Sequence, residues 1–277
     1  MICSDYSAIE AVVLAQLAGE QWRIDVFNTH GKIYEMSAAK ITGIPFDEII
    51  DHKKRTGDHH PARGKIGKVA ELASGYQGWV GAWKAFGADK HLSEDEIKSA
   101  VIAWRNESPA IVEFWRGLET AAHNAVMNPG HAYGYRDIAY KMSGDVLYCR
   151  LPSGRFIIYH NPRLVTADRF GKPVTKLTYM RNDSIYGWGR DDTYGGRLAE
   201  NTVQAVSRDI LAHAMPRLEA AGYKIVLHVH DEVAAEVPEG FGSVDELERI
   251  MGDLPAWAAG WPVRAAGGWR GVRYRKD

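Results

Sequence analysis

The sequence predicts a mixed fold of the α/β (α+β) class, and three observations lead to this prediction. The chain opens on a short strand and passes directly into a helical pattern over residues 9–17. Helical patterns then dominate its middle part. Near the end, two strand patterns, residues 223–229 and 233–237, flank a tight turn that holds His230, Asp231 and Glu232. A sheet with a hairpin and a largely helical middle part is therefore expected.

The helices of the middle part are predicted from capping signals and apolar periodicity. Ser93 and Glu96 form a capping box, which predicts a helix to about Asn106. Pro109 then occupies the first position of a second helix, where its missing N–H costs nothing. The apolar face of this second helix follows helical spacing: Ile111, Phe114, Trp115, Leu118, Ala122 and Ala125.

The second half of the chain alternates strands with helices. Residues 147–159 carry two strand patterns around Pro152-Ser153-Gly154, which predicts a hairpin. Gly222 closes a helix over residues 198–221. A second capping box, Ser243 with Glu246, opens the last helix.

Composition and charge exclude several classes of protein. Among 277 residues, 34 Lys and Arg against 35 Asp and Glu give a formal net charge of −1, unlike a histone or a basic ribosomal protein. No apolar run approaches the roughly 18 residues that a membrane span needs, and no basic segment of a secretory signal opens the chain. Two cysteines, Cys3 and Cys149, are too few for a disulfide framework, so a reducing compartment is expected.

Tryptophan is the one unusual component. The chain holds nine tryptophans. Large aromatic side chains at this density indicate either an aromatic core or surfaces on which flat ligands stack. The sequence leaves both open.

Two aspartates suggest a metal site. Asp5 follows a short strand at the start of a helix, and Asp231 lies in the hairpin turn, so neighbouring strands would bring both carboxylates to one end of the sheet. Few protein oxygens plus water suit Mg²⁺, and paired Mg²⁺ ions suit in-line displacement at phosphorus. The alternative is that Asp5 caps the helix and Asp231 merely suits a turn, which is commoner for either residue alone.

A transition-metal site is a second candidate in the same turn. His228 and His230 stand two residues apart, as on one face of a strand, and Asp231 could be a third ligand for Zn²⁺ in a metallo-hydrolase. No second histidine-rich cluster of matching spacing accompanies them in the last hundred residues.

A basic segment precedes a predicted helix over residues 63–79. Residues 51–60 are polar and unpatterned, which indicates a mobile connection, and residues 51–68 hold six Lys or Arg against two Asp. One helical stripe then carries two cations, an apolar residue and two aromatics: Lys65, Lys68, Leu72, Tyr76 and Trp79. Such a stripe fits a nucleoside triphosphate lying along a helix. The alternative is an amphipathic helix whose aromatics enter the core, but four glycines in this segment favour close approach or movement.

These three pieces resemble, in order, the three polymerase motifs of family A DNA polymerases, the bacterial DNA polymerase I family. Residues 5–10 (Asp-Tyr-Ser-Ala-Ile-Glu) resemble motif A, residues 63–76 resemble motif B in the fingers helix, and residues 229–232 (Val-His-Asp-Glu) resemble motif C. The resemblance is closest to the phage-encoded branch, through residues 67–73 and 200–205. It covers essentially the whole chain.

The resemblance implies the chemistry of the site. Asp5 and Asp231, with the Tyr6 carbonyl, would hold two Mg²⁺ ions, for which Mn²⁺ can substitute. A primer 3′-hydroxyl would attack the α-phosphorus of a dNTP on primer-template DNA. Lys68 would clamp the triphosphate with Arg63 and donate a proton to the leaving pyrophosphate.

The resemblance also assigns the residues around the reacting groups. Glu10 would be the steric gate against a ribose 2′-hydroxyl, and Tyr76 would close over the templating base pair. Leu72 stands where relatives place an aromatic against the sugar. The primer and template would contact four residues: His230, Glu232, Gln204 and Asn201.

The sequence departs from the family pattern at three points. Val12 stands where relatives have Arg two residues after the gate glutamate. Gly64 stands at the usual place of the motif B arginine, so Arg63 lies one residue further back, and the Asn201–Gln204 spacing is one residue short of the bacterial pattern.

The resemblance places palm in residues 1–24 (motif A), fingers in 25–190 (motif B) and palm again in 191–277 (motif C). Relatives carry an exonuclease domain, a thumb and further palm strands before motif A, and these are expected to be absent here. A separate polypeptide is therefore expected to supply the thumb and outer strands, as in a split polymerase, with a bacterial or phage-infected host cytoplasm as the location. The alternatives are a non-catalytic nucleic-acid-binding module with the polymerase fold, and the metallo-hydrolase.

Overall fold

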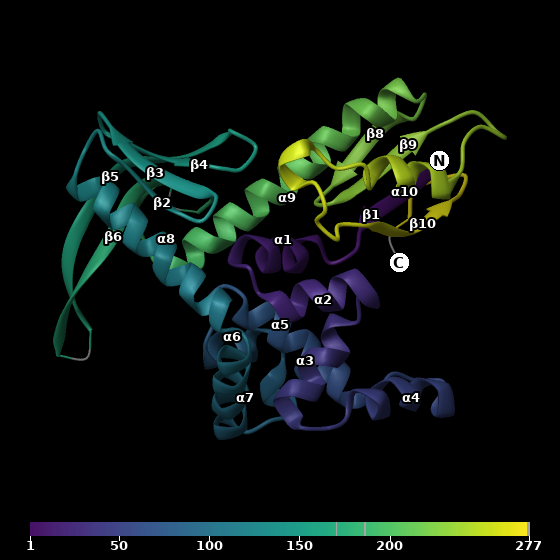
Figure 1. Ribbon diagram of the computed structural model, residues 1–277, viewed down its shortest axis with the longest axis horizontal. Coiled ribbons are helices and arrows are strands. Elements are labelled where there is room, and N and C mark those ends of the chain that lie inside the picture. Colours follow the sequence, from purple (N-terminus) through teal and green to yellow (C-terminus); the bar gives the residue numbers. More distant parts are fainter. Residues whose placement is uncertain (170, 186, 276–277) are drawn as a thin grey trace. The chain divides into compact units, whose positions relative to one another are not determined.

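The structure is a computed structural model that describes residues 1–169, 171–185 and 187–275 (Figure 1). The chain ends in a basic tail with five Lys or Arg residues, namely Arg264, Arg270, Arg273, Arg275 and Lys276, of which Lys276 lies outside the described residues. Contacts divide the chain into two units, Met1–Val13 with Val203–Asp277, and Leu14–Thr202. We call them the first and the second unit. The palm and fingers bounds expected from the sequence remain a prediction.

The first unit is built on a four-stranded antiparallel sheet in the order β10-β1-β9-β8. Its strands are β1 (Ile2–Tyr6), β8 (Lys224–Val229), β9 (Glu232–Glu236) and β10 (Ala265–Arg270). The hairpin of β8 and β9 expected from the sequence is present, and the opening strand, β1, lies centrally between β9 and β10. The mixed helical and antiparallel fold class is thereby confirmed.

Helix α10 (Val244–Met251) holds the centre of this sheet through polar contacts. Glu248 Oε1 accepts hydrogen bonds from Ser4 Oγ at 2.9 Å and from the Gly268 amide at 2.8 Å, which joins β1 and β10 to the helix. The Tyr6 hydroxyl donates to the Met251 carbonyl at 2.8 Å. Alternation along β1 therefore turns Ser4 and Tyr6 toward α10 and leaves Asp5 on the opposite face.

The second unit begins with helices, and α1 (Ile9–Ala18) crosses into it from the first. They continue as follows: α2 (Gln21–Thr29), α3 (Ile33–Thr42), α4 (Phe46–Thr56), η1 (Arg63–Lys68), α5 (Val69–Ser74), α6 (Val80–Ala85), η2 (Ala88–Lys90), α7 (Glu94–Glu107) and α8 (Pro109–Met127). The mobile connection predicted at 51–60 is wrong in its first half, because α4 runs to Thr56. Basic residues in its last turn and the left-handed Gly57 suit a helix end.

The capping box of α7 and the apolar face of α8 are confirmed. Ser93 and Glu96 exchange both hydrogen bonds of the box, and all six predicted face residues of α8 are buried. The cap of α8 is Glu20, whose Oε2 accepts from the amides of Ala110 at 2.9 Å and Ile111 at 3.3 Å. A carboxylate at this helix end satisfies first-turn amides that have no acceptor within the helix.

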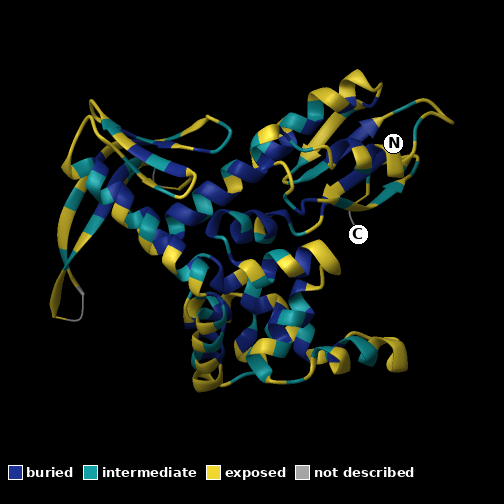
Figure 2. Ribbon diagram, viewed as in Figure 1, coloured by how far each residue is buried: buried dark blue, intermediate teal, exposed yellow. Residues whose placement is uncertain are grey.

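A six-stranded antiparallel sheet, ordered β2-β3-β4-β5-β6-β7, completes the second unit. Its strands are β2 (Ala132–Tyr135), β3 (Ile138–Ser143), β4 (Val146–Arg150), β5 (Phe156–Arg169), β6 (Lys172–Asp183) and β7 (Gly187–Thr193). The sequence predicted only the β4–β5 hairpin. One face buries Tyr140, Leu147, Cys149 and Tyr159, and α8 contacts β2 to β5 (Figure 2). Many of the remaining strand positions are intermediate or exposed, but Ile138 and residues 177–179 are buried as well.

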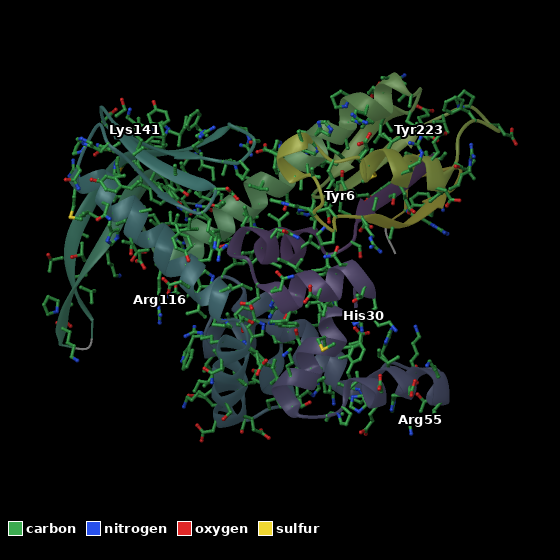
Figure 3. The ribbon with its side chains drawn as sticks, in the orientation of Figure 1. Tyr6, His30, Arg55, Arg116, Lys141 and Tyr223 are labelled. Carbon is green, nitrogen blue, oxygen red and sulfur yellow. The ribbon has the colours of Figure 1, made fainter. Side chains whose placement is uncertain are left out.

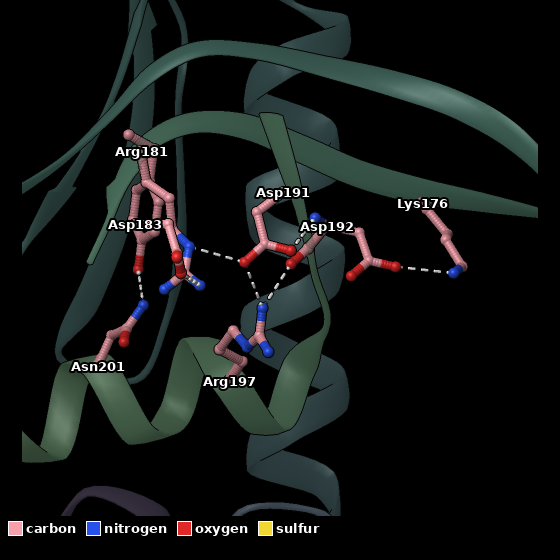
Figure 4. Close-up of polar contacts among 8 residues, drawn as sticks. Lys176, Arg181, Asp183, Asp191, Asp192, Arg197 and Asn201 are labelled. Atoms are coloured by element: carbon pink, nitrogen blue, oxygen red, sulfur yellow. Dashed lines mark hydrogen bonds and ion pairs between the residues drawn. The ribbon is translucent and has the colours of Figure 1, made fainter. Parts of the chain in front are cut away.

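An ion-pair network fastens the last two strands to helix α9 (Gly195–Ala220), which runs from the second unit into the first. Asp191 Oδ2 lies 2.8 Å from Arg181 Nε and 3.0 Å from Arg197 Nη1, and Arg197 also donates to the Asp192 carbonyl at 2.9 Å (Figure 4). Asn201 Nδ2 donates to the Tyr159 hydroxyl at 3.2 Å. The start of α9 is thus tied to β7 directly, to β6 through Asp191, and to β5 through Tyr159.

Within the described residues, no helix is both long and apolar enough to cross a membrane. The longest one, α9, is amphipathic and includes Pro216. Its apolar residues are buried, for example Leu198, Val206 and Ile210. The apolar side of α9 therefore packs against the rest of the protein.

Candidate active site

Strands β1 and β9 bring two predicted metal ligands to one end of the sheet of the first unit. In the register of these strands, Asp5 lies opposite Glu232, and Asp231 directly precedes Glu232. Asp5 and Asp231 are therefore near neighbours at this sheet end, Asp5 exposed and Asp231 half-buried. The expectation that their strands are adjacent is confirmed.

A two-residue turn presents Asp231. Val229 pairs with Glu232, so His230 and Asp231 alone close the hairpin. His230 has a φ of 55°, in the left-handed region that such tight turns require and that residues other than glycine adopt uncommonly. The turn thus fixes the backbone direction from which Asp231 leaves the sheet.

The donor set at this sheet end fits a hard divalent cation. It consists of two carboxylates, Asp5 and Asp231, and the backbone carbonyl of Tyr6 beside them. Across the described part of the chain, no group of three or more His, Cys, Asp or Glu side chains is arranged to hold a metal ion. Any bound cation must therefore keep water or substrate oxygens among its ligands, as Mg²⁺ does.

The zinc alternative is not supported by this geometry. A site made of His228, His230 and Asp231 would be such a three-member group, and none is found among the residues described. β8 ends at Val229, so His230 has left the strand on whose face both imidazoles were expected. His228 Nδ1 instead lies 3.3 Å from Arg208 Nη1.

Glu232 has a partner that sequence reasoning missed. The Tyr274 hydroxyl donates to Glu232 Oε2 at 2.7 Å, and this hydrogen bond raises the pKa of Tyr274. The ring of Tyr274, in the tail, also contacts the ring of Trp269 on β10, and the two ring centroids lie 6.2 Å apart. The only signal in the sequence was an aromatic residue within a basic tail.

The basic segment of motif B is helical but irregular. Residues Arg63–Lys68 form a π-helix that continues into α5, and the helix ends at Ser74. Lys65, Lys68 and Leu72 are exposed along it. The stripe predicted to reach Trp79 is therefore wrong at its far end, because Tyr76 and Trp79 follow the helix rather than continue it.

Arg63 is oriented by α3. Its Nε donates to Glu35 Oε1 at 2.7 Å, and its guanidinium lies 5.3 Å from the centre of the Tyr34 ring. Gly67 meets the same helix, since a Cβ there would stand 1.9 Å from the Tyr34 carbonyl oxygen. Close backbone approach thus explains this glycine, as the sequence suggested.

Glu71 fixes the buried side of α5 and was not singled out from the sequence. It forms an ion pair with Arg23, and its Oε1 accepts from Ser37 Oγ at 2.5 Å and from Trp104 Nε1 at 3.0 Å. Arg23 is 2% exposed and also donates to Ser108 Oγ at 2.9 Å. With this side held, Lys68 and Leu72 face outward.

Tryptophans and one arginine hold the end of motif B. Trp83 Nε1 donates to Ser74 Oγ at 2.9 Å, and Trp115 Nε1 donates to the Gly75 carbonyl at 2.8 Å. Arg105 donates to the Gly78 carbonyl at 3.0 Å and lies 4.8 Å from the ring of Trp79, which is 44% exposed. Several tryptophans thus build the core of this unit, and Trp79 does not enter it.

Three further predicted residues lie on the two helices that cross between the units. Glu10 is exposed in the first turn of α1. Gln204 is exposed on α9, and Asn201, one turn earlier on the same helix, is engaged with Tyr159. Val12, at the family's arginine position, is buried.

Comparisons with known proteins confirm the resemblance to family A DNA polymerases. One relative matches along nearly the whole chain: the DNA polymerase of Bacillus phage SP02 is 46% identical over 265 residues, which is 95% of this chain and 39% of that protein. The DNA polymerase I of Mycobacterium bovis is 33% identical over 55 residues, 20% of this chain and 6% of its own length. No family model matches the chain.

The fold agrees with a solved polymerase domain. The POL domain of Pol1 from M. smegmatis, in complex with DNA primer-template and dNTP, matches with a TM-score of 0.60 at 18% identity. The match covers 96% of this chain and 38% of that one. The chain thus resembles the family A polymerase domain in fold and the phage SP02 polymerase in sequence, and it spans about two fifths of the length of either.

Proposed function

We propose that this chain carries the active site of a template-directed DNA polymerase, which transfers a nucleotidyl group from a dNTP to a primer 3′-hydroxyl. It would act in the cytoplasm of a bacterial or phage-infected cell. The observation that carries the proposal is the placement of Asp5 on β1 and of Asp231 in the turn that leads into the adjacent strand β9, both at one sheet end. Similarity to the phage SP02 polymerase across 95% of the chain supports it.

In this proposal Asp5, Asp231 and the Tyr6 carbonyl would hold two Mg²⁺ ions, and Mn²⁺ could replace them. When bound, such ions lower the pKa of an attacking hydroxyl and neutralise charge on a leaving phosphate. The protein residues supply fixed geometry. The two-residue turn orients Asp231, and the strand register sets its distance from Asp5.

The residues of motif B would bind the incoming nucleotide. Lys68 and Arg63 would contact the triphosphate, and Lys68 would supply a proton to the leaving pyrophosphate. Arg63 is already oriented by Glu35, which lowers the entropy lost when it binds an anion. Leu72 would lie against the sugar and Tyr76 against the new base pair.

Residues of motif C and α9 would contact the primer and template. His230 and Glu232 would support the primer end, and Gln204 would reach the minor groove. The amide of Asn201 already donates to Tyr159, so its contact with nucleic acid would need a change of partner. Gln204 is exposed and has no such requirement.

We also propose that a polypeptide segment outside these 277 residues covers the β8 edge of the first unit. A groove of about 420 Å³ runs between β8 and α9, lined mainly by apolar side chains. Val226 and Leu227 are 46% and 41% exposed at its rim, and the register shift between Ile225 and Leu227 marks a bulge there. Exposed apolar edge strands favour pairing with another chain.

Copurification tests this proposal. A second polypeptide that copurifies with the wild-type chain but not with the Leu227→Lys variant would support it, and a fully active monomer would contradict it.

The experiment must not depend on whether the chain works alone. We would replace the matching 265 residues of the phage SP02 polymerase with this chain and measure Mg²⁺-dependent primer extension with the four dNTPs. Asp5→Ala and Asp231→Ala should each lower the rate by about 10³-fold or more, because each removes a fixed charge at the reacting phosphate.

Asp89→Ala is the matched control, because Asp89 is an exposed aspartate of the second unit that the proposal does not use. It should leave the rate unchanged. Extension that survives both active-site substitutions would overturn the two-metal assignment. A folded, DNA-binding chimera that never extends a primer would favour the non-catalytic module instead.

A further inference from the structure

The six-stranded sheet of the second unit exposes one face that the proposed function does not use. Strand register places its side chains in cross-strand rows: Arg150 with Phe156, Lys141 with Tyr148 and Ile158, and Val146 with His160, Met180 and Arg190. Trp188 lies two residues from Arg190 on β7. We call these residues, with Arg163, the outer sheet face. Lys141 is labelled in Figure 3.

Large rings are exposed on this face. Trp188 is 59% exposed and Phe156 49%, and the aliphatic Ile158 beside them is 48% exposed. The rings also contact one another, with Tyr148 and Phe156 centroids 5.9 Å apart and His160 and Trp188 centroids 5.7 Å apart. Phe156 and His160 are four positions apart along β5, which is about 13 Å, so the face offers more than one stacking position.

Cations stand between and beside these rings. Lys141, Arg150, Arg163 and Arg190 are all exposed, and Asp145 is an acidic neighbour at the rim. Residues 132–193 hold ten Lys or Arg against six Asp, a net charge of +4 in a chain whose total is −1. The face therefore complements a polyanion.

A groove on this face is organised by a bulge in β5. The register shifts between His160 and Arg163, and Asn161 there has a φ of 46°. Arg190 Nη1 donates to the Asn161 carbonyl at 3.0 Å, and Arg163 Nε donates to Asn161 Oδ1 at 3.3 Å. The bulge thus sets two guanidinium groups beside Trp188 and His160, around a groove of about 490 Å³.

We infer that the outer sheet face binds single-stranded DNA, with bases stacked on Trp188, Phe156 and Tyr148 and phosphates on the four cations. Base stacking needs exposed flat rings, phosphate contact needs cations at strand spacing, and this face supplies both. The choice of DNA as the strand rests on the proposed function, in which an unpaired template leads into the site.

The test is fluorescence anisotropy of a labelled dT20 oligonucleotide with the full chain, in Mg²⁺-free buffer. Phe156→Ala with Trp188→Ala should weaken binding by at least about 10-fold, since each ring supports a stacked base. Trp188→Phe should restore part of the affinity, because it keeps a ring. Arg150→Ala with Arg163→Ala should reduce the slope of log K against log salt concentration by about 1.4.

Phe86→Ala with Arg116→Ala is the matched control. Phe86 is 51% exposed and Arg116 lies on the exposed side of α8, both off the sheet. This pair should leave dT20 binding unchanged. Circular dichroism melting checks that every variant is folded.

The outcomes separate this inference from the proposed function. Loss of dT20 binding in the sheet variants, with extension of a one-nucleotide overhang retained, supports the inference. Wild-type affinity in a folded Phe156→Ala/Trp188→Ala variant overturns it, as does self-association that these substitutions abolish, since the face would then bind protein. An inactive chimera that still binds dT20 through this face contradicts only the proposed function.

Discussion

The role proposed for Glu10 is selection against a ribose sugar from the start of α1. It is exposed in the first helical turn, two residues after Ala8, whose φ of 51° marks the sharp passage from β1 into the helix. If it is the steric gate, Glu10→Ala should admit a ribose 2′-hydroxyl and reduce the preference for dATP over ATP by about 10-fold or more. Values of kcat/KM for both nucleotides in the chimera measure this.

Glu239→Ala, at another exposed glutamate of the same unit, is the control for this prediction. It should keep the full preference for dATP. An unchanged preference in Glu10→Ala would contradict the assignment of Glu10 as the steric gate.

Cys149 gives a residue-scale prediction about reactivity. It lies on β4, with its side chain fully buried on the inner face of the six-stranded sheet, and burial raises the pKa of its thiol to about 12. Because the thiolate is the nucleophile, only about 10⁻⁴ of the thiol is reactive at pH 8. A thiol reagent should therefore label Cys149 only after unfolding, with mass spectrometry of the labelled peptide as the measurement.

The same shift sets a pH window for stability. The unfolded thiol has an ordinary pKa near 9, and the folded value lies above it, so the folded state holds the proton more tightly. The contribution is complete below about pH 8 and is lost as the pH rises from 9 toward 12. Rapid labelling of native protein at pH 8 would contradict the buried position.

At the scale of the element, motif B depends on its buried side. The Glu71 carboxylate pairs with Arg23, which is nearly inaccessible to solvent. Glu71→Gln would leave the Arg23 charge uncompensated, so we expect a loss of about 3–5 kcal/mol in the free energy of unfolding. Urea denaturation followed by circular dichroism measures this loss.

A surface glutamate is the control for Glu71. Glu113 Oε2 lies 3.8 Å from Arg116 Nη1 on the exposed side of α8. Glu113→Gln should therefore change the midpoint of urea denaturation little. If Glu71→Gln were equally silent, the ion pair would not be what holds α5.

The elements that could be predicted from the sequence are those with a local signal. The capping box of Ser93 and Glu96 and the apolar spacing on α8 are read from neighbouring residues alone, and both are confirmed. The turn at Asp231 was predicted because two apolar strands flank it. The adjacency of β1 and β9, which makes the candidate site, joins segments more than 200 residues apart, so it could be stated from the sequence only as a condition, and the strand register supplies it.

What was missed depends on contacts distant in the chain. The π-helix at Arg63–Lys68 changes the hydrogen-bond offset without changing composition, and the helix ends at Ser74 through packing with distant residues, so the stripe predicted to reach Trp79 is too long. Arg23 and Glu71 look like surface charges until folding buries them together. Strands β6 and β7 carry many charged residues, some of them in ion pairs, and only a short stretch of β6 around Leu177 and Tyr179 is buried, so no long apolar alternation marked them in the sequence.

At the scale of the whole molecule, the net charge of −1 is an average of unlike parts. The first unit holds 9 basic and 13 acidic residues, a net of −4, and the second holds 25 and 22, a net of +3. The acidic balance lies with the sheet that carries Asp5 and Asp231, where cations are expected. Attraction to phosphate is therefore expected from local basic patches, such as the outer sheet face of the second unit, rather than from the mean charge.

This distribution predicts that the position of a charge matters more than the total. Lys141→Glu and Lys90→Glu change the net charge equally, but Lys141 lies on the outer sheet face and Lys90 lies in η2. At 50 mM KCl, Lys141→Glu should weaken dT20 binding about 5- to 10-fold, and Lys90→Glu should have little effect. At 300 mM KCl the difference should shrink, because added salt screens exposed charges. Equal weakening by both substitutions at low salt would mean that the mean charge of the protein governs binding. It would contradict the proposal that the outer sheet face attracts single-stranded DNA.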